Sequence, residues 1–208
     1  MTKISRPRSS PNVAISQVKY TDPNPLLRFA NQRFFGAIDS LLEPLSVGTV
    51  LDAGCGEGVI LDRLNGRIGE HVFGMDLDRA RLSHGNPVMP SRSLVVGDIH
   101  QLPFATASFD LVLVLEVFEH VGDPQLALRE AFRVGQRYLL ASVPNEPWWR
   151  IGNMLRLKYL RQWGNTPEHI QHWNVWGFRR FIASLFSIVK LKTPFLLTFV
   201  LARKPERT

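Results

Sequence analysis

The sequence predicts an α/β fold built on a doubly wound, Rossmann-like sheet of seven strands. The sheet is expected to be mostly parallel with a C-terminal antiparallel hairpin, and to carry helices on both faces. Three observations indicate this fold. Short apolar runs alternate with segments of helical periodicity. Runs such as "LVLVL" are apolar at every position, as is typical of parallel strands buried on both faces. The first run leads through glycines into a helical pattern.

The predicted elements follow in a regular order. A helix is expected over 25–43, where apolar residues recur at helical spacing until Pro44. Five strands are expected at 49–53, 71–75, 93–97, 111–115 and 138–142, with helices near 57–65, 78–84, 124–134 and 174–186. Two last strands, near 185–192 and 196–203, meet at Thr193-Pro194 and form the hairpin.

Length and composition favour one domain. At 208 residues and 45% hydrophobic, the chain suits a domain over 21–208 after a flexible, basic tail over 1–20. No run approaches the ~20 apolar residues that a membrane span needs, and the N-terminus lacks the apolar core of a secretory signal. Cys55 is the only cysteine, which excludes an internal disulfide. We therefore expect a cytoplasmic protein.

Positive charge and tryptophan are concentrated in the last third of the chain. Residues 148–208 carry eleven Lys/Arg against two Asp/Glu, although the whole chain has a net charge of only +7. All five tryptophans fall within 148–176. This asymmetry predicts an anionic partner or surface near the second part of the chain.

The stretch "VLDAGCGEG", residues 50–58, indicates a ligand site. Its apolar run reads as a buried strand that ends near Asp52 and turns through Gly54, Gly56 and Gly58 into a helix. Glycine is used where a side chain would block a sharp turn or the close approach of another molecule. The first backbone N–H groups of a helix also lack partners within it.

Acidic residues follow the next strands. Asp76 in "GMDLD" lies about twenty residues beyond the glycines, a position that suits the hydroxyls of a ribose. Asp98 in "GDIHQLPF" can accept a hydrogen bond from an exocyclic amine such as that of adenine. The fourth strand ends at Glu116, just before Glu119 and His120. The first two features leave NAD and S-adenosylmethionine (SAM) both open.

Four segments together resemble the successive motifs of the class I SAM-dependent methyltransferases. They are "VLDAGCGEG", "GMDLD", "GDIHQLPF…SFDLVLVLEVFEHV" and "ALREAFRV", and the resemblance covers roughly residues 45–145. The nearest subgroup is the small-molecule and quinone-type one. The resemblance implies an enzyme that transfers a methyl group from SAM and releases S-adenosylhomocysteine.

The resemblance also implies which residues hold the cofactor. Asp52 and the loop of Gly54 and Gly56 would hold the methionine part, Asp76 the ribose, and Leu77, Asp98 and Ile99 the adenine, while Glu116 would stand where SAM meets the acceptor.

Residues 145–176 are expected to form an inserted lid or acceptor-binding segment. Within it, residues 148–163 are apolar around most of a helical wheel, interrupted by arginine and lysine. Such a helix is buried, covers an apolar ligand or contacts an anionic membrane surface. The segment resembles the variable insertion of the ubiquinone-pathway O-methyltransferases. We therefore expect a small, apolar or aromatic acceptor, with O-methylation favoured and carbon or nitrogen acceptors left open.

Three histidines are candidates for the catalytic base. His169 and His172 lie in "PEHIQHW", and His120 follows the fourth strand. A histidine near its ordinary pKa can accept a proton while the methyl group moves. No metal is expected, because the pair His169 and His172 lacks an evident third ligand.

Three alternatives remain at this point. A nucleic-acid methyltransferase would use the basic, tryptophan-rich part, but the fourth strand ends in "EVFEH" rather than an Asn/Asp-Pro-Pro-aromatic motif, so nucleic acid is a disfavoured partner. A dehydrogenase would share the glycines and Asp76 but leaves Asp98 and "LPF" unexplained. A non-catalytic SAM-binding protein would keep the same cradle.

Overall fold

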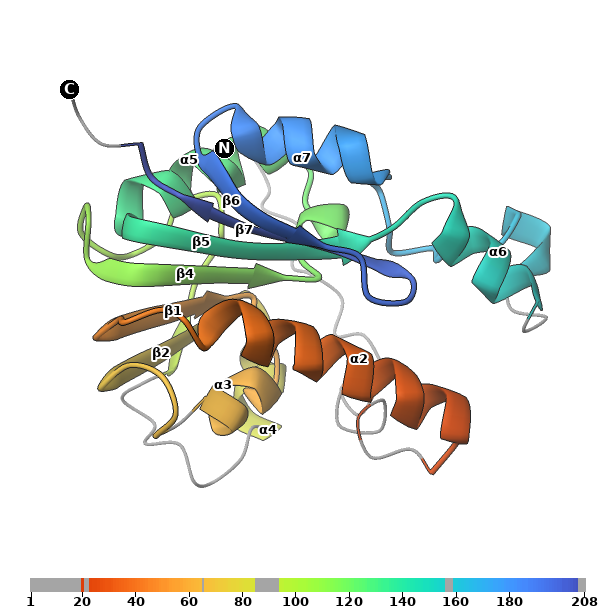
Figure 1. Cartoon of the computed structure of the whole chain (residues 1–208), viewed down its shortest axis with the longest axis horizontal. Coiled ribbons are helices and arrows are strands. Elements are labelled where there is room, and N and C mark those ends of the chain that lie inside the picture. The colour runs from red at the N-terminus through yellow and green to blue at the C-terminus, as the bar shows by residue number, and fades with distance from the viewer. Residues whose placement is uncertain (1–19, 21–22, 65, 85–93, 156–158, 206–208) are drawn as a thin grey trace, which may run out of the picture.

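The computed structural model of the chain describes residues 20, 23–64, 66–84, 94–155 and 159–205. They build a seven-stranded sheet with helices on both faces (Figure 1). The strand order is β3-β2-β1-β4-β5-β7-β6. Neighbours among β1 to β5 are parallel, whereas β7 pairs antiparallel with both β5 and β6. The predicted fold class, including the C-terminal hairpin, is confirmed.

The elements lie close to their predicted ranges. The strands are β1 Thr49–Ala53, β2 His71–Asp76, β3 Leu94–Val96, β4 Phe109–Leu115, β5 Gly135–Pro144, β6 Ser187–Lys192 and β7 Leu197–Arg203. The helices are α2 Pro25–Leu42, α3 Val59–Leu64, α4 Arg79–His84, α5 Pro124–Val134, α6 Trp148–Leu155 and α7 Val175–Ala183, with the short 3₁₀ helices η2 Phe118–His120 and η3 Leu160–Gln162. Strand β5 is longer than expected because it pairs with β4 on one side and β7 on the other.

Side-chain caps fix where three of the helices begin. The side chains of Asn24, Asp123 and Asn174 accept hydrogen bonds from backbone N–H groups in the first turns of α2, α5 and α7. Such a cap satisfies an N–H group that has no partner within the helix, and is worth about 1 kcal/mol. In α2 and α5 a proline in the first turn also presets the helical backbone.

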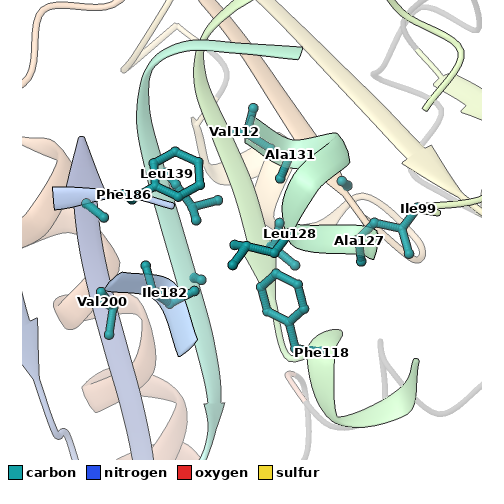
Figure 2. Packing of buried hydrophobic residues seen from close by; sticks show 14 of the residues in the cluster. Ile99, Val112, Phe118, Ala127, Leu128, Ala131, Leu139, Ile182, Phe186 and Val200 are labelled. Atoms are coloured by element: carbon teal, nitrogen blue, oxygen red, sulfur yellow. The ribbon is translucent and has the colours of Figure 1, made fainter. Parts of the chain in front are cut away.

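The central strands bury both of their faces. Leu51 and Val112 face the cluster formed with α5 and α7, whereas their neighbours Val50 and Leu111 face the cluster formed with α2 and α3. Figure 2 shows the first cluster, in which Leu128 of α5 lies beside Phe118 of η2. This two-sided burial explains why the strands read as uninterrupted apolar runs.

The predicted continuous helix over 148–163 is wrong. Helix α6 ends at Leu155, and residues 156–158 lie outside the described residues. The chain then turns back, with left-handed φ values of 53° at Tyr159 and 52° at Trp163. At Gly164, also left-handed, a Cβ would collide with the carbonyl group of Arg150, so only glycine permits the return onto α6.

Figure 1 shows α6 beyond the ends toward which β4 and β5 point. This is the edge of the sheet at which α/β folds bind ligands. In the described part of the chain, no helix is long and apolar enough to cross a membrane. The tail expected over 1–20 lies, apart from Tyr20, outside the described residues.

Candidate functional site

The glycine loop joins the carboxyl ends of β1 and β2. The backbone N–H groups of Gly54 and Cys55 donate to the carbonyl oxygen of Met75 at 2.7 and 3.0 Å. Gly54 has φ +94°, and a Cβ there would collide with Val117 Cγ2. Gly56 has φ +55°, but a Cβ there would meet nothing within 4 Å. Gly54 is therefore required by packing, whereas the backbone at Gly56 is open to the approach of another molecule.

Asp76 is bound to this loop. One carboxylate oxygen accepts from Gly56 N–H and the other from Asp78 N–H, both at 2.8 Å. Each carboxylate oxygen can accept a second hydrogen bond, so the group can hold the loop and receive ligand hydroxyls together. The next side chain, Leu77, is 71% exposed although it is apolar. These positions agree with the ribose and adenine contacts expected of the two residues, which remain predictions.

Asp52 is a buried carboxylate at the end of β1. Only 1% of the residue is exposed, and its Oδ2 atom is buried without a hydrogen bond. Burial, together with the charge of Asp76, raises the pKa of Asp52 from 3.8 to about 7. A cationic ligand group beside Asp52 would offset the cost of the buried charge. The orphaned oxygen and the open loop therefore fit the positively charged methionine part of SAM.

Asp98 and Ile99 differ in exposure. Burial of Asp98 disfavours its charge, but hydrogen bonds from the backbone and ring of His100 outweigh that effect and lower its pKa. The Asp98 carboxylate thus bonds to His100 of its own loop. An adenine amine that donated to the same carboxylate would share it with His100. Ile99 is 7% exposed and packs into the cluster around α5 (Figure 2), so only a small part of it is available to flank a ring.

Glu116 links the ends of β4 and β5. Its backbone N–H donates to the carbonyl oxygen of Ser142 at 3.1 Å, and the Ser142 hydroxyl donates to Glu116 Oε1 at 3.0 Å. The left-handed φ of 57° at Glu116 turns the chain directly into η2. The next residue, Val117, is the one that packs against Gly54. Glu116 therefore lies between the glycine loop and the start of η2.

The three candidate histidines fall into two places. The rings of His120 and His169 lie 5.0 Å apart between centroids, and Trp149 stacks on His169. His172 instead faces Glu146, with Nδ1 3.8 Å from Oε1. The structure thus places His169 beside His120 and His172 beside Glu146, although the two histidines lie only three residues apart in the sequence. The structure gives His169 new neighbours, Glu119 and His120.

Glu146 is a site residue that the sequence reasoning missed. It lies two residues beyond the end of β5 and is only 9% exposed, and both of its carboxylate oxygens are buried without a hydrogen bond. Burial raises the pKa of Glu146, although the charges of His172 and Arg150 oppose this. Its position at the carboxyl end of a central strand, in "PNEP", was the available signal.

Backbone hydrogen bonds hold the segment after α6 against the end of β4. The N–H groups of Ile170 and Gln171 both donate to the carbonyl oxygen of Glu119, at 2.9 and 3.0 Å. The Gln171 side chain donates to the carbonyl oxygen of Val121 at 3.3 Å. The segment therefore borders the glycine loop across η2.

Asp110, the second residue of β4, has a structural role. Its carboxylate accepts from the backbone N–H groups of Gly48 and Thr49 at 2.7 and 3.1 Å. These bonds join the amino ends of β1 and β4, at the opposite edge of the sheet from the glycine loop.

The strand order and the acidic residues beside a glycine loop define a doubly wound, Rossmann-like fold with a ligand site at the carboxyl ends of its strands. Residues 51–137 match the family described as "Methyltransferase domain". Over this part, which is less than half of its 208 residues, the chain is similar to SAM-dependent methyltransferases, and SAM is the cofactor of those enzymes.

Curated relatives match the same region. A probable SAM-dependent methyltransferase of Mycolicibacterium smegmatis is 37% identical over 98 residues, which are 46% of this chain and 38% of the relative. A ubiquinone biosynthesis O-methyltransferase of Azorhizobium caulinodans is 36% identical over 103 residues, 48% of this chain and 40% of the relative. A malonyl-[acyl-carrier protein] O-methyltransferase of Erwinia billingiae is 38% identical over 85 residues, 41% of this chain and 34% of the relative. The chain thus spans well under half the length of these relatives.

Solved structures share the fold over most of the chain. Magnesium protoporphyrin IX methyltransferase from Synechocystis, with bound S-adenosylhomocysteine, has a TM-score of 0.66 and 18% identity, covering 91% of this chain and 92% of that one. A Haloferax volcanii complex of the Trm112 activator with a putative methyltransferase has a TM-score of 0.69 and 17% identity, covering 87% of this chain and 94% of that one. At this identity the likeness concerns the fold alone.

Proposed function

We propose that this protein is an enzyme that transfers a methyl group from SAM to an oxygen atom of a small acceptor. One observation carries the proposal. The buried, incompletely bonded Asp52, the open backbone at Gly56 and the carboxylate of Asp76 meet at the carboxyl ends of β1 and β2. The family match over residues 51–137 supports SAM as the methyl donor, and relatives named as O-methyltransferases support the oxygen acceptor.

The proposed roles follow from the site. When bound, SAM supplies a methyl carbon activated by a sulfonium. Asp52 and the loop of Gly54 and Gly56 hold the cationic methionine part, and Asp76 holds the ribose. The adenine lies by Leu77, with Asp98 and Ile99 at its edge. Glu116 stands between this cofactor site and the acceptor side, where the protein must align the nucleophile and exclude water.

The acceptor site is proposed to lie under residues 145–176, within a single domain over 21–208. This segment holds His169 beside His120, and Trp149 shields one face of the His169 ring. Either histidine can accept the proton of an acceptor hydroxyl. His172 is the third candidate for this base, and its contact in the structure is with Glu146. Aromatic side chains at this position favour an apolar or aromatic acceptor.

A contact with an anionic membrane surface is proposed for the outer side of α6 and the segment after it. Trp148 is 58% exposed and Trp163 75% exposed, and Arg150 and Arg161 lie among them. Tryptophan and arginine suit the boundary between lipid and water. Sedimentation with vesicles tests this, because binding to anionic vesicles that salt abolishes is expected, and equal recovery with neutral vesicles contradicts it.

Transfer of labelled methyl from SAM into a cell extract tests the function. The extract is then divided into organic, aqueous and nucleic-acid fractions. Label in a small molecule of the organic fraction, stable to nuclease and protease, is the expected result. Label in nucleic acid would support the alternative that the basic C-terminal part first raised. No label in any fraction, with SAM binding measured separately, would leave two readings: an acceptor that is absent from the extract, or a protein that binds SAM without transferring its methyl group.

A further inference from the structure

A cluster of three metal-ligand side chains lies at the end of β4. Glu119, His120 and His169 each offer one ligand atom, and these atoms all lie within 4.8 Å of one another. Glu119 is 1% exposed and His169 8% exposed, whereas His120 reaches the surface. We propose that these three side chains bind a divalent transition-metal ion, of which Zn²⁺ is the reference.

The donor set matches this class of ion. One carboxylate and two imidazoles are the protein ligands of open zinc sites, which keep a further position for water or substrate. Imidazole suits zinc and its neighbours, while magnesium and calcium prefer sites made of oxygen ligands. The Glu-His-His set therefore distinguishes the proposed ion from Mg²⁺.

Hydrogen bonds around the cluster hold the ligands in place. His120 Nδ1 lies 2.9 Å from the carbonyl oxygen of Glu168. A carbonyl oxygen can only accept, so Nδ1 carries the proton and the neutral ring keeps its lone pair at Nε2. Metal-bound histidines are commonly oriented by such a bond from the other ring nitrogen.

The backbone brings the third ligand to the other two. The N–H groups of Ile170 and Gln171, directly after His169, donate to the carbonyl oxygen of Glu119. Trp149 stacks on the His169 ring and limits how far it can rotate. The ligands thus come from two segments about fifty residues apart in the chain, and they are fixed by contacts outside the cluster.

The cluster borders the proposed cofactor site. Glu119 lies two residues beyond Val117, which packs against Gly54 of the glycine loop. An ion there would polarise an oxygen atom of the acceptor that binds at its open coordination position. It would take the lone pairs of His120 and His169, so it would replace the role of base proposed for these two histidines. The polarising role of the ion depends on the proposed function, but binding of the ion does not.

Metal titration of the whole chain tests the proposal. The protein is stripped with a chelator and titrated with Zn²⁺ by calorimetry, and separately with Co²⁺, whose visible absorption reports coordination by nitrogen and oxygen ligands. One equivalent of Zn²⁺ is expected to bind in the absence of SAM. His120→Asn and His169→Asn are expected to weaken binding at least about 100-fold, since even the loss of an outer-shell partner costs 10–100-fold.

His172→Asn is the matched control, because it removes a histidine from the same loop that faces Glu146 instead. Unchanged affinity is expected there. Glu119→Gln should also lose the ion, and if burial makes that variant unfold, the exposed His120 decides the result.

The proposal is overturned if the wild type binds no zinc, or if the His120 and His169 variants bind zinc as tightly as the wild type. It is also overturned if only the His172 variant loses zinc affinity. Failure of SAM binding with intact zinc binding would instead refute only the proposed function.

Discussion

Asp52→Asn tests whether a buried carboxylate defines the cofactor site. With a pKa of about 7 in the folded protein and 3.8 in the unfolded chain, Asp52 holds its proton more tightly when folded. Between these values the unfolding free energy of the wild type falls as pH rises. From about pH 5 to about pH 8 the loss amounts to about 2.5 kcal/mol, at 1.36 kcal/mol per pKa unit. Asparagine cannot ionise, so the Asp52→Asn variant should not show this loss of unfolding free energy.

Urea unfolding at several pH values, followed by the fluorescence of the five tryptophans, measures this effect. The free-energy difference between variant and wild type is expected to shift by about 2.5 kcal/mol in favour of Asp52→Asn as pH rises from about 5 to about 8. A difference that stays constant over this range contradicts the burial argument, whatever its absolute value.

The same carboxylate should make SAM binding depend on pH. At about pH 6 only about a tenth of a group with a pKa of about 7 is ionised, so wild-type affinity for SAM should be about tenfold lower than at about pH 8. The Asp52→Asn variant should bind weakly at both. Equal wild-type affinity at the two pH values would refute the contact between Asp52 and the cationic part of SAM.

Three further predictions concern the same site. Asp76→Ala should weaken SAM binding at least about 100-fold in a calorimetric titration, because hydrogen bonds to a charged group contribute roughly 1.5–3 kcal/mol each, and unchanged affinity would remove the ribose assignment. Gly54→Ala should lower the unfolding free energy by more than the roughly 1–3 kcal/mol of backbone strain alone, because its Cβ collides with Val117. Gly56→Ala should instead impair SAM binding more than stability, because a Cβ there meets no protein atom. Urea unfolding and SAM titration of both variants measure the two effects, and equal losses of stability in the two variants would contradict the packing at Gly54. His169→Ala should slow methyl transfer more than it weakens SAM binding, and equal loss in both would indicate a structural role.

The fold could be predicted from the sequence because its signals are local. The apolar run at 111–115 and the cap at Asp123 each identify an element from a few neighbouring residues. The acidic residues at the ends of β1 and β2 could be predicted in the same way, since parallel strands bring their carboxyl ends together. The strand order then placed Asp52 and Asp76 beside one glycine loop.

The acceptor side could not be predicted to the same depth. Helix α6 ends at Leu155, and left-handed backbone follows at Tyr159 and Trp163, although neither residue type signals such a backbone. His169 lies close to His120 because the backbone N–H groups that follow it, at Ile170 and Gln171, donate hydrogen bonds to the carbonyl oxygen of Glu119. Periodicity carries no information on such a contact, so His169 was grouped with its sequence neighbour.

Calorimetric titration of the purified chain with SAM, S-adenosylhomocysteine and NAD tests the central claim most directly. One equivalent each of SAM and S-adenosylhomocysteine should bind to the wild type, the affinity for both should fall at least about 100-fold in Asp76→Ala, and NAD should give no heat of binding. Binding of NAD in place of SAM, or an unchanged affinity for SAM in Asp76→Ala, would contradict the cofactor site described for this protein.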